Sequence, residues 1–155
     1  MVNPEKKPTE SRPGHVAIFG GLGEDLSNVA AGWKKNLVPF DTVFNQSESS
    51  YLFGSPDIVD IFMNGRTNVV GFAYDESYED FSQDNSDYLD TWVLERAKEF
   101  FQKEKKLEEE KSELFFFHLL GSDTNGHVHK PSSFQFGYAY FKLILKNYSK
   151  RFQIH

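Results

Sequence analysis

The sequence predicts an α/β domain whose sheet is mainly parallel. Two short apolar runs, residues 69–74 and 113–120, have the length and composition of buried strands. Apolar residues at helical spacing precede each run, and a polar segment with two glycines follows the second. Because crossover helices join the strands of a parallel sheet, this alternation of helices and strands is typical of an α/β fold.

Three helices are predicted around these strands. Residues 10–22 form a short helix that accepts Pro13 in its first turn, where a missing N–H loses no helical hydrogen bond. A loop-rich stretch over residues 24–45 follows, and residues 55–65 form a second helix, started by Ser-Pro-Asp and stopped by glycine. The third helix covers residues 87–111 and ends in a charged, solvated segment. Its apolar positions recur at steps of three and four residues: Leu89, Trp92, Val93, Ala97, Phe100, Phe101 and Leu107.

The composition excludes several classes of protein. With 39% hydrophobic residues and 16 phenylalanines, the 155-residue chain can bury a core, which disordered chains cannot. A net charge of −6 without a basic patch argues against nucleic acid as a partner. There are no cysteines, so disulfide bonds and thiolate chemistry are excluded. We expect neither a signal peptide nor a membrane-spanning helix in these residues, because no apolar stretch approaches about 20 residues.

The segment HLLGSDTNGHVHKP, which starts at His118, carries the strongest chemical signal. Functional loops of α/β sheets follow the carboxyl ends of strands, and Asp123 and His127 stand four residues apart in this loop. A carboxylate oxygen and an imidazole nitrogen both suit zinc, and Gly126 would let the backbone turn both toward one point. The alternative is a glycine-rich turn in which Asp123 caps a local N–H. We expect His118 to be a packed or hydrogen-bonded core residue.

Two motifs give the chain a family resemblance. The pattern Asp-Thr-x-Gly-His at 123–127 looks like the metal motif of the alkaline phosphatase superfamily, and Pro-Thr-x-x-x-Pro-x-His at 8–15 resembles the nucleophile segment of its phosphodiesterase-like branch. Four blocks in order, PTESRPGHVA, FDTVFNQS, FGSPDI and HLLGSDTNGH, are similar to the phosphoethanolamine transferases of GPI-anchor biosynthesis. The resemblance implies a partial alkaline-phosphatase-like three-layer sandwich over residues 9–133, with a flexible lead at 1–8 and a divergent aromatic and basic tail at 134–155.

The resemblance also implies an activity, which is transfer of phosphoethanolamine from phosphatidylethanolamine to the first mannose of the GPI-anchor precursor. Thr9 would be the nucleophile at a helix start, where free N–H groups and the helix dipole favour a phosphoryl anion. Asn45 would hydrogen-bond a phosphoryl oxygen, and Asp123 and His127 would bind zinc in a site that holds two zinc ions in the family. The lipid and the glycolipid would be the partners, on the lumenal side of the endoplasmic reticulum membrane, with membrane contact through segments absent from this chain.

The implied zinc site is incomplete in these residues. The family also uses an aspartate on a strand before the nucleophile and, after the metal motif, an Asp-His pair and a further histidine; the sequence offers neither set. Because zinc sites usually have three or four protein ligands, we expect the 155-residue chain alone to be inactive. Two alternatives stay open. The first is a non-catalytic module that keeps the phosphate pocket, and the second is an interaction fragment that uses the charged helix 87–111.

Overall fold

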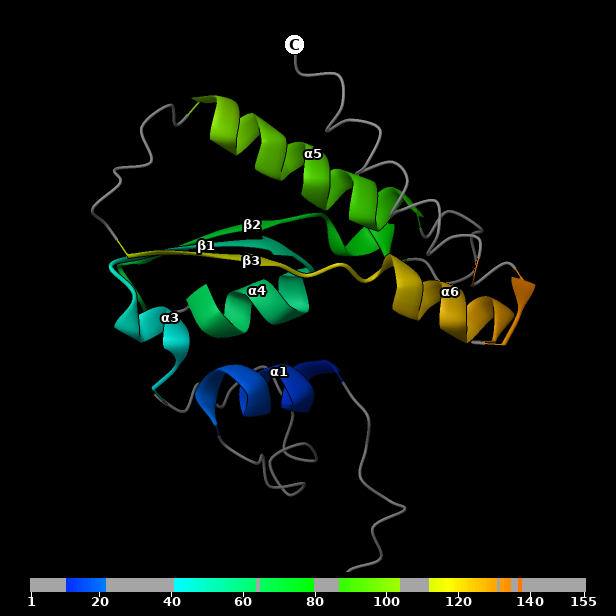
Figure 1. Ribbon diagram of the computed structural model, residues 1–155, viewed down its shortest axis with the longest axis horizontal. Coiled ribbons are helices and arrows are strands. Elements are labelled where there is room, and N and C mark those ends of the chain that lie inside the picture. Colours follow the sequence, from blue (N-terminus) through cyan, green and yellow to red (C-terminus); the bar gives the residue numbers. More distant parts are fainter. Residues whose placement is uncertain are drawn as a thin grey trace, which may run out of the picture.

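The computed structural model describes residues 11–21, 41–63, 65–79, 87–103, 112–130, 132–134 and 137. These residues form a parallel sheet flanked by helices, which confirms the predicted α/β class (Figure 1). The predicted lead at 1–8, most of the predicted tail and residues 24–40 of the predicted loop lie outside the described residues. The elements are α1 (Ser11–Gly20), α3 (Val43–Gln46), β1 (Ser49–Gly54), α4 (Pro56–Met63), β2 (Val69–Ala73), the 3-10 helix η2 (Glu76–Tyr78), α5 (Asp87–Lys103), β3 (Glu113–Phe117) and α6 (Gly121–His129).

The sheet has the strand order β2-β1-β3, and both strand pairs are parallel. The register places Leu52 of β1 between Gly71 of β2 and Phe116 of β3. The sequence did not predict β1, although it is the central strand. Its sequence, SSYLFG, has a short apolar run between serines and a glycine, so neither alternation nor length marks it as a strand.

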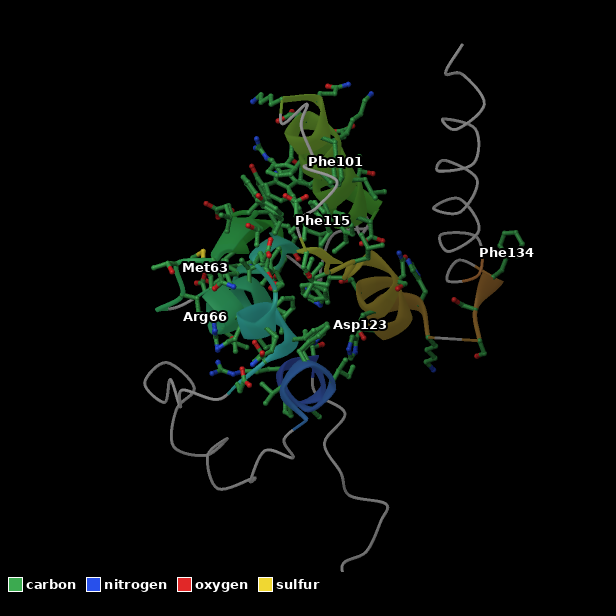
Figure 2. The ribbon with its side chains drawn as sticks, turned by 60° about the vertical axis from the view of Figure 1, so that its left-hand side comes forward. Met63, Arg66, Phe101, Phe115, Asp123 and Phe134 are labelled. Atoms are coloured by element: carbon green, nitrogen blue, oxygen red, sulfur yellow. The ribbon has the colours of Figure 1, made fainter. Side chains whose placement is uncertain are left out.

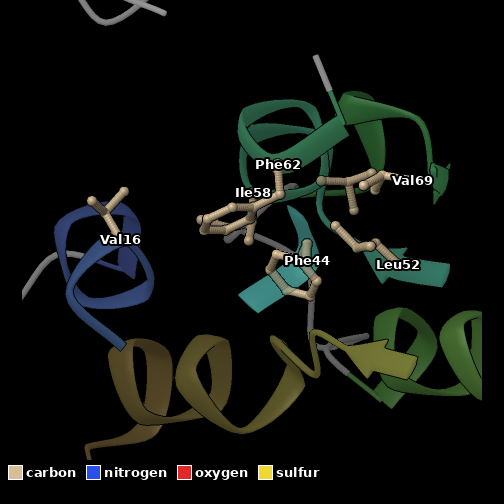
Figure 3. Close-up of a cluster of buried hydrophobic side chains, with 7 residues drawn as sticks. Val16, Phe44, Leu52, Ile58, Phe62 and Val69 are labelled. Atoms are coloured by element: carbon tan, nitrogen blue, oxygen red, sulfur yellow. The ribbon is translucent and has the colours of Figure 1, made fainter. Parts of the chain in front are cut away.

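Successive side chains of β1 enter two cores on opposite faces of the sheet, as the two-residue period of a strand requires. Leu52 packs on the face that α1 and α4 cover, and Phe53 packs on the face that α5 covers (Figure 1). The first core is drawn in Figure 3 and consists of Val16, Phe44, Leu52, Ile58, Val59, Phe62 and Val69. The second core consists of Phe53, Tyr74, Leu89, Val93, Ala97 and Leu120.

Helix α4 begins and ends where its sequence predicts. The Ser55 carbonyl accepts the N–H groups of Ile58 and Val59 at 3.2 and 2.9 Å, so the helix starts directly after it. Pro56 takes the first helical position, where its missing N–H has no partner in any helix. Gly65 has a φ of 73°, a left-handed conformation that glycine adopts without strain.

Two predictions about the second apolar run are wrong. The strand ends at Phe117 rather than at residue 120, and the segment after it is the helix α6 rather than the predicted loop. The His118 N–H still bonds to the Phe53 carbonyl at 2.8 Å, but Leu120 already has helical angles, with φ −88° and ψ −13°. Gly126 is therefore an interior residue of a helix. Part of the predicted loop is also helical, because α3 lies within it.

The strand order reverses between β1 and β3. The chain runs from β1 through α4 outward to β2, and it then returns through α5 past β1 to β3. Right-handed crossovers in opposite directions place their helices on opposite faces, which is how α4 and α5 lie (Figure 1). In such sheets ligands bind outside the carboxyl ends of the strands at the point of reversal, and this is where β3 leads into α6.

Candidate metal site

Asp123 and His127 lie one helical turn apart on the exposed side of α6. A spacing of four residues puts both side chains on one face of a helix, and Nε2 of His127 lies 3.5 Å from Oδ2 of Asp123. The two side chains are 55% and 71% exposed, respectively, so an ion can reach both from solvent. Asp123 projects from the side of α6 nearer to α1 (Figure 2). The two side chains are neighbours, as the sequence predicts, but a helix brings them together instead of a turn at Gly126, and their role as metal ligands stays a prediction.

The geometry of this pair fits two ligands of one zinc ion. Two ligand bonds of about 2.1 Å at a tetrahedral angle separate the donor atoms by about 3.4 Å, and the observed separation is 3.5 Å. An exposed pair of this kind adds little to the stability of the fold. Within the part of the chain that the structure describes, no three His, Asp or Glu side chains gather around a possible metal position. These residues therefore show no complete metal site, and the pair offers two candidate ligands.

The inner side of α6 is buried in the protein. Thr124 and Asn125 are buried, and both bond back to the start of the helix. Thr124 Oγ1 donates to the Leu120 carbonyl at 3.0 Å, and Asn125 Nδ2 donates to the Gly121 carbonyl at 3.0 Å. These hydrogen bonds satisfy polar groups that burial would otherwise leave unpaired. Thus one side of α6 is held in the protein while the other presents Asp123 and His127.

Helix α1 passes beside the end of β3. The ring centroids of His15 on α1 and His118 lie 4.9 Å apart in an edge-on contact, and His15 Nδ1 donates to the Ser11 carbonyl at 2.5 Å. His118 is 7% exposed, which confirms that it is a core residue. In Figure 1 the first turn of α1 lies at the same end of the sheet as α6. Thr9 itself lies outside the described residues.

Asn45 lies at the opposite end of the sheet. It belongs to α3, which precedes β1, whereas α6 follows β3; because the strands are parallel, the two helices stand at opposite sheet ends (Figure 1). The carboxamide Oδ1 of Asn45 accepts hydrogen bonds from Thr42 Oγ1 at 2.7 Å and from Arg66 Nε at 2.6 Å. The structure therefore does not bring Asn45 together with Asp123 and His127.

The sequence did not lead us to predict one buried polar residue beside α6. Asp90 of α5 is 3% exposed, and its Oδ1 accepts the Gly121 N–H at 2.7 Å. A signal for it does exist. Asp90 stands three residues before Val93 and seven before Ala97, so it lies on the apolar stripe of its helix, where a carboxylate indicates a buried interaction.

The buried His118 predicts a pH-dependent stability. Burial, with a smaller contribution from the neighbouring His15, lowers the pKa of His118 from 6.5 to about 4. The unfolded chain therefore binds a proton that the folded protein does not, and stability is complete above pH 6.5 and falls as the pH drops toward 4. We expect a loss of about 3 kcal/mol across this window, measured by urea unfolding at several pH values.

The matched variants for this pH series are His118→Phe and His127→Gln. The first removes the buried imidazole, so its unfolding free energy should vary less between pH 6.5 and pH 4. The second removes an exposed imidazole and should keep the dependence of the unmodified protein. Equal pH dependence in the unmodified protein and in His118→Phe would contradict this assignment.

The fold and the pair together define an α/β protein with a candidate metal site at the carboxyl end of its parallel sheet. Comparison with known proteins identifies the relatives. The chain is similar to GPI ethanolamine phosphate transferase 1 of Mus musculus, at 48% identity over 141 residues and 85% of this chain. It is 49% identical to the Homo sapiens protein of that name over 135 residues (81% of this chain) and 42% identical to the Yarrowia lipolytica one over 155 residues (94%). The chain is homologous to GPI ethanolamine phosphate transferase 1 over most of its own length, which confirms the resemblance predicted from its motifs.

The chain spans a small part of these relatives. The matched segment covers 15% of the mouse protein, 14% of the human protein and 16% of the Yarrowia lipolytica protein. No protein-family model matches the chain, and no solved structure matches it. None of the helices in the described ranges is both long enough and apolar enough to cross a lipid bilayer.

Proposed function

We propose that these residues form part of the catalytic domain of a phosphoethanolamine transferase that acts on the GPI-anchor precursor. The observation that carries the proposal is the Asp123–His127 pair beyond the carboxyl end of a parallel strand. The relatives are named ethanolamine phosphate transferases, and we therefore take phosphoethanolamine as the group that is transferred. The donor would be phosphatidylethanolamine, and the acceptor would be a hydroxyl of the first mannose.

Thr9 is the proposed nucleophile. Its hydroxyl oxygen would form a bond to the phosphorus of phosphatidylethanolamine, and the diacylglycerol oxygen would leave with the electron pair of the broken bond and gain a proton. A mannose hydroxyl would then attack the same phosphorus, and the Thr9 oxygen would leave and regain a proton. The start of α1, two residues after Thr9, would direct free N–H groups and the positive end of the helix dipole toward the phosphoryl oxygens.

Asp123 and His127 would hold one zinc ion through a carboxylate oxygen and an imidazole nitrogen. When bound, zinc supplies positive charge that activates a hydroxyl nucleophile and stabilises phosphoryl oxygens. In this proposal the described residues would provide two ligands of the two-zinc site, and residues outside them would have to complete it. For this reason we expect no transfer by the 155-residue chain alone.

The finer features of the resemblance belong to the same proposal. The described strands would be part of an alkaline-phosphatase-like three-layer sandwich over residues 9–133, on the lumenal side of the endoplasmic reticulum membrane. Asn45 as a ligand of the phosphoryl group stays a prediction from the resemblance. Its place at the amino end of β1, with its oxygen bonded to Thr42 and Arg66, lends that role no support.

Zinc binding by the chain tests the proposed pair. We expect weak zinc binding at a stoichiometry of one, because two ligands are fewer than a stable zinc site uses. Asp123→Ala and His127→Ala should each weaken that binding by about tenfold or more. The affinity is measured by isothermal titration calorimetry or by competition with a chromophoric chelator, at one pH for all variants.

Asp60→Ala is the control for this measurement, because Asp60 is an exposed carboxylate on α4. Its zinc affinity should equal that of the unmodified chain. Tight, stoichiometric zinc binding by the unmodified chain would contradict the expectation that its set of zinc ligands is incomplete. Unchanged affinity in both Asp123→Ala and His127→Ala would contradict the site itself.

A further inference from the structure

The helix that carries the candidate ligands has no N-terminal cap of its own. Leu120, the residue before α6, has helical backbone angles and offers no side-chain acceptor to the first N–H groups of the helix. A helix start leaves such N–H groups without helical partners, and an acceptor must come from elsewhere. The first of these groups, the Gly121 N–H, is buried.

The acceptor comes from a different helix. Asp90 of α5 places its Oδ1 2.7 Å from the Gly121 nitrogen, although 31 positions separate the two residues in the chain. The carboxylate is buried, at 3% exposure of the residue, and its negative charge stands at the positive end of the α6 dipole. A charge-assisted hydrogen bond that is shielded from solvent is stronger and more directional than one on the surface.

The hydrogen bond from Gly121 to Asp90 lies close to the Asp123–His127 pair in the same helix. Gly121 is the first residue of α6, Asp123 is the third, and His127 follows one turn later. The bond to the Gly121 N–H therefore restrains the start of the helix, and the rotation of α6 decides where both ligand atoms point. The hydrogen bonds from the Thr124 and Asn125 side chains to Leu120 and Gly121 run within α6 and its first turn.

We propose that Asp90 is a positioning residue for the Asp123–His127 pair, acting through its hydrogen bond to the Gly121 N–H. This inference rests on the proposed function, because it takes the pair to be metal ligands. Asp90 does not touch the metal position in this role. It holds the helix that presents the ligands, as the outer hydrogen-bond partners of metal ligands do in other sites.

The test compares Asp90→Ala, Asp90→Asn and Glu95→Gln in the full 155-residue chain. Alanine removes the acceptor, whereas asparagine keeps an acceptor oxygen in the same place and loses the charge. Glu95 is an exposed acid on the same helix and serves as the control. Zinc affinity is measured by calorimetry, and hydrogen exchange at the Gly121 amide is followed by NMR, with folding checked by the dispersion of the amide spectrum.

We expect Asp90→Ala to weaken zinc binding by about tenfold and to speed exchange of the Gly121 amide, while the strand amides of β1 keep their protection. Asp90→Asn should recover part of both effects, and Glu95→Gln should change neither. If Asp90 only stabilises the fold, the folded Asp90 variants will bind zinc like the unmodified chain, and that result overturns the proposal. If Asp90→Ala does not fold, the zinc affinity of Asp90→Asn relative to that of the unmodified chain decides whether the proposal stands.

Asp123→Ala separates this proposal from the one on which it rests. If Asp123→Ala leaves zinc affinity unchanged, the pair is not a metal site and both proposals fail. If Asp123→Ala weakens binding and neither Asp90 variant does, the metal site stands and the positioning role of Asp90 is rejected.

Discussion

Replacing Thr9 by alanine should lower phosphoethanolamine transfer by more than about 1,000-fold, because the proposed reaction has no other oxygen to form the covalent intermediate. The substitution is made in a chimaera in which residues 8–133 of this chain replace the matching segment of the full-length mouse relative. Transfer is followed with a labelled phosphatidylethanolamine, and zinc content is measured on the same preparation. Zinc content should stay nearly unchanged, since the proposed zinc ligands Asp123 and His127 are untouched.

Thr67→Ala in the same chimaera is the matched control. Thr67 is an exposed threonine just before β2, at the end of the sheet away from α6, and its loss should leave transfer at the level of the unmodified chimaera. Normal turnover by Thr9→Ala would end the nucleophile assignment. A chimaera without transfer activity, in a preparation that binds zinc normally, would count against the proposed function of the whole segment.

Replacing Gly54 by alanine should destabilise the fold by about 3 kcal/mol or more. Gly54 ends the central strand with a φ of 154°, a conformation that residues with a side chain rarely adopt. An added Cβ would lie 2.5 Å from the Cβ of His118 and 3.0 Å from its carbonyl oxygen. Either β1 or the segment after β3 must move, and the contact of His118 with His15 on α1 would be lost with it. The loss is measured as the change in unfolding free energy by urea titration.

Gly14→Ala is the counterpart of this substitution. Gly14 lies inside α1, and, apart from its chain neighbours and the backbone of its own helix, no atom of the described residues stands within 4 Å of the position that its Cβ would take. Alanine has the higher helix propensity, so the free energy of unfolding of this variant should be unchanged or higher by about 0.5–1 kcal/mol. If Gly54→Ala proved as stable as Gly14→Ala, the close approach of β1 to His118 would be wrong.

The sequence predicts those elements whose signals are local. Helix α4 has a Ser-Pro start and a glycine stop, and its observed bounds lie close to the predicted ones. Helix α5 has an apolar stripe over several turns and starts at the predicted residue 87, whereas residues 104–111 of the predicted helix lie outside the described residues. Strand β1 lacks such a signal. It is short and rich in serine, and its burial comes from β2 and β3, which pair with it from 15 or more residues further along the chain. The β character of β1 is therefore a tertiary property.

The candidate site was predicted in part for similar reasons. The four-residue spacing of Asp123 and His127 predicts that they share a face only in a helix, and the two glycines of the segment led to a turn instead. Asn45 and Asp123 fall on opposite ends of the sheet because of the order in which the strands pair, which no spacing in the sequence records. Asp90 meets Gly121 only after α5 has packed across the sheet.

The most direct test of the zinc site is NMR of the histidine side chains of the 155-residue chain during a zinc titration. Long-range proton–nitrogen spectra resolve the ring nitrogens of all 5 histidines. We expect the ring nitrogens of His127 to shift on binding and those of the buried His118 to stay unchanged, and we expect Asp123→Ala to remove most of the His127 shift. If zinc shifts only other histidines, or if the His127 shift survives Asp123→Ala, then Asp123 and His127 do not share a metal ion.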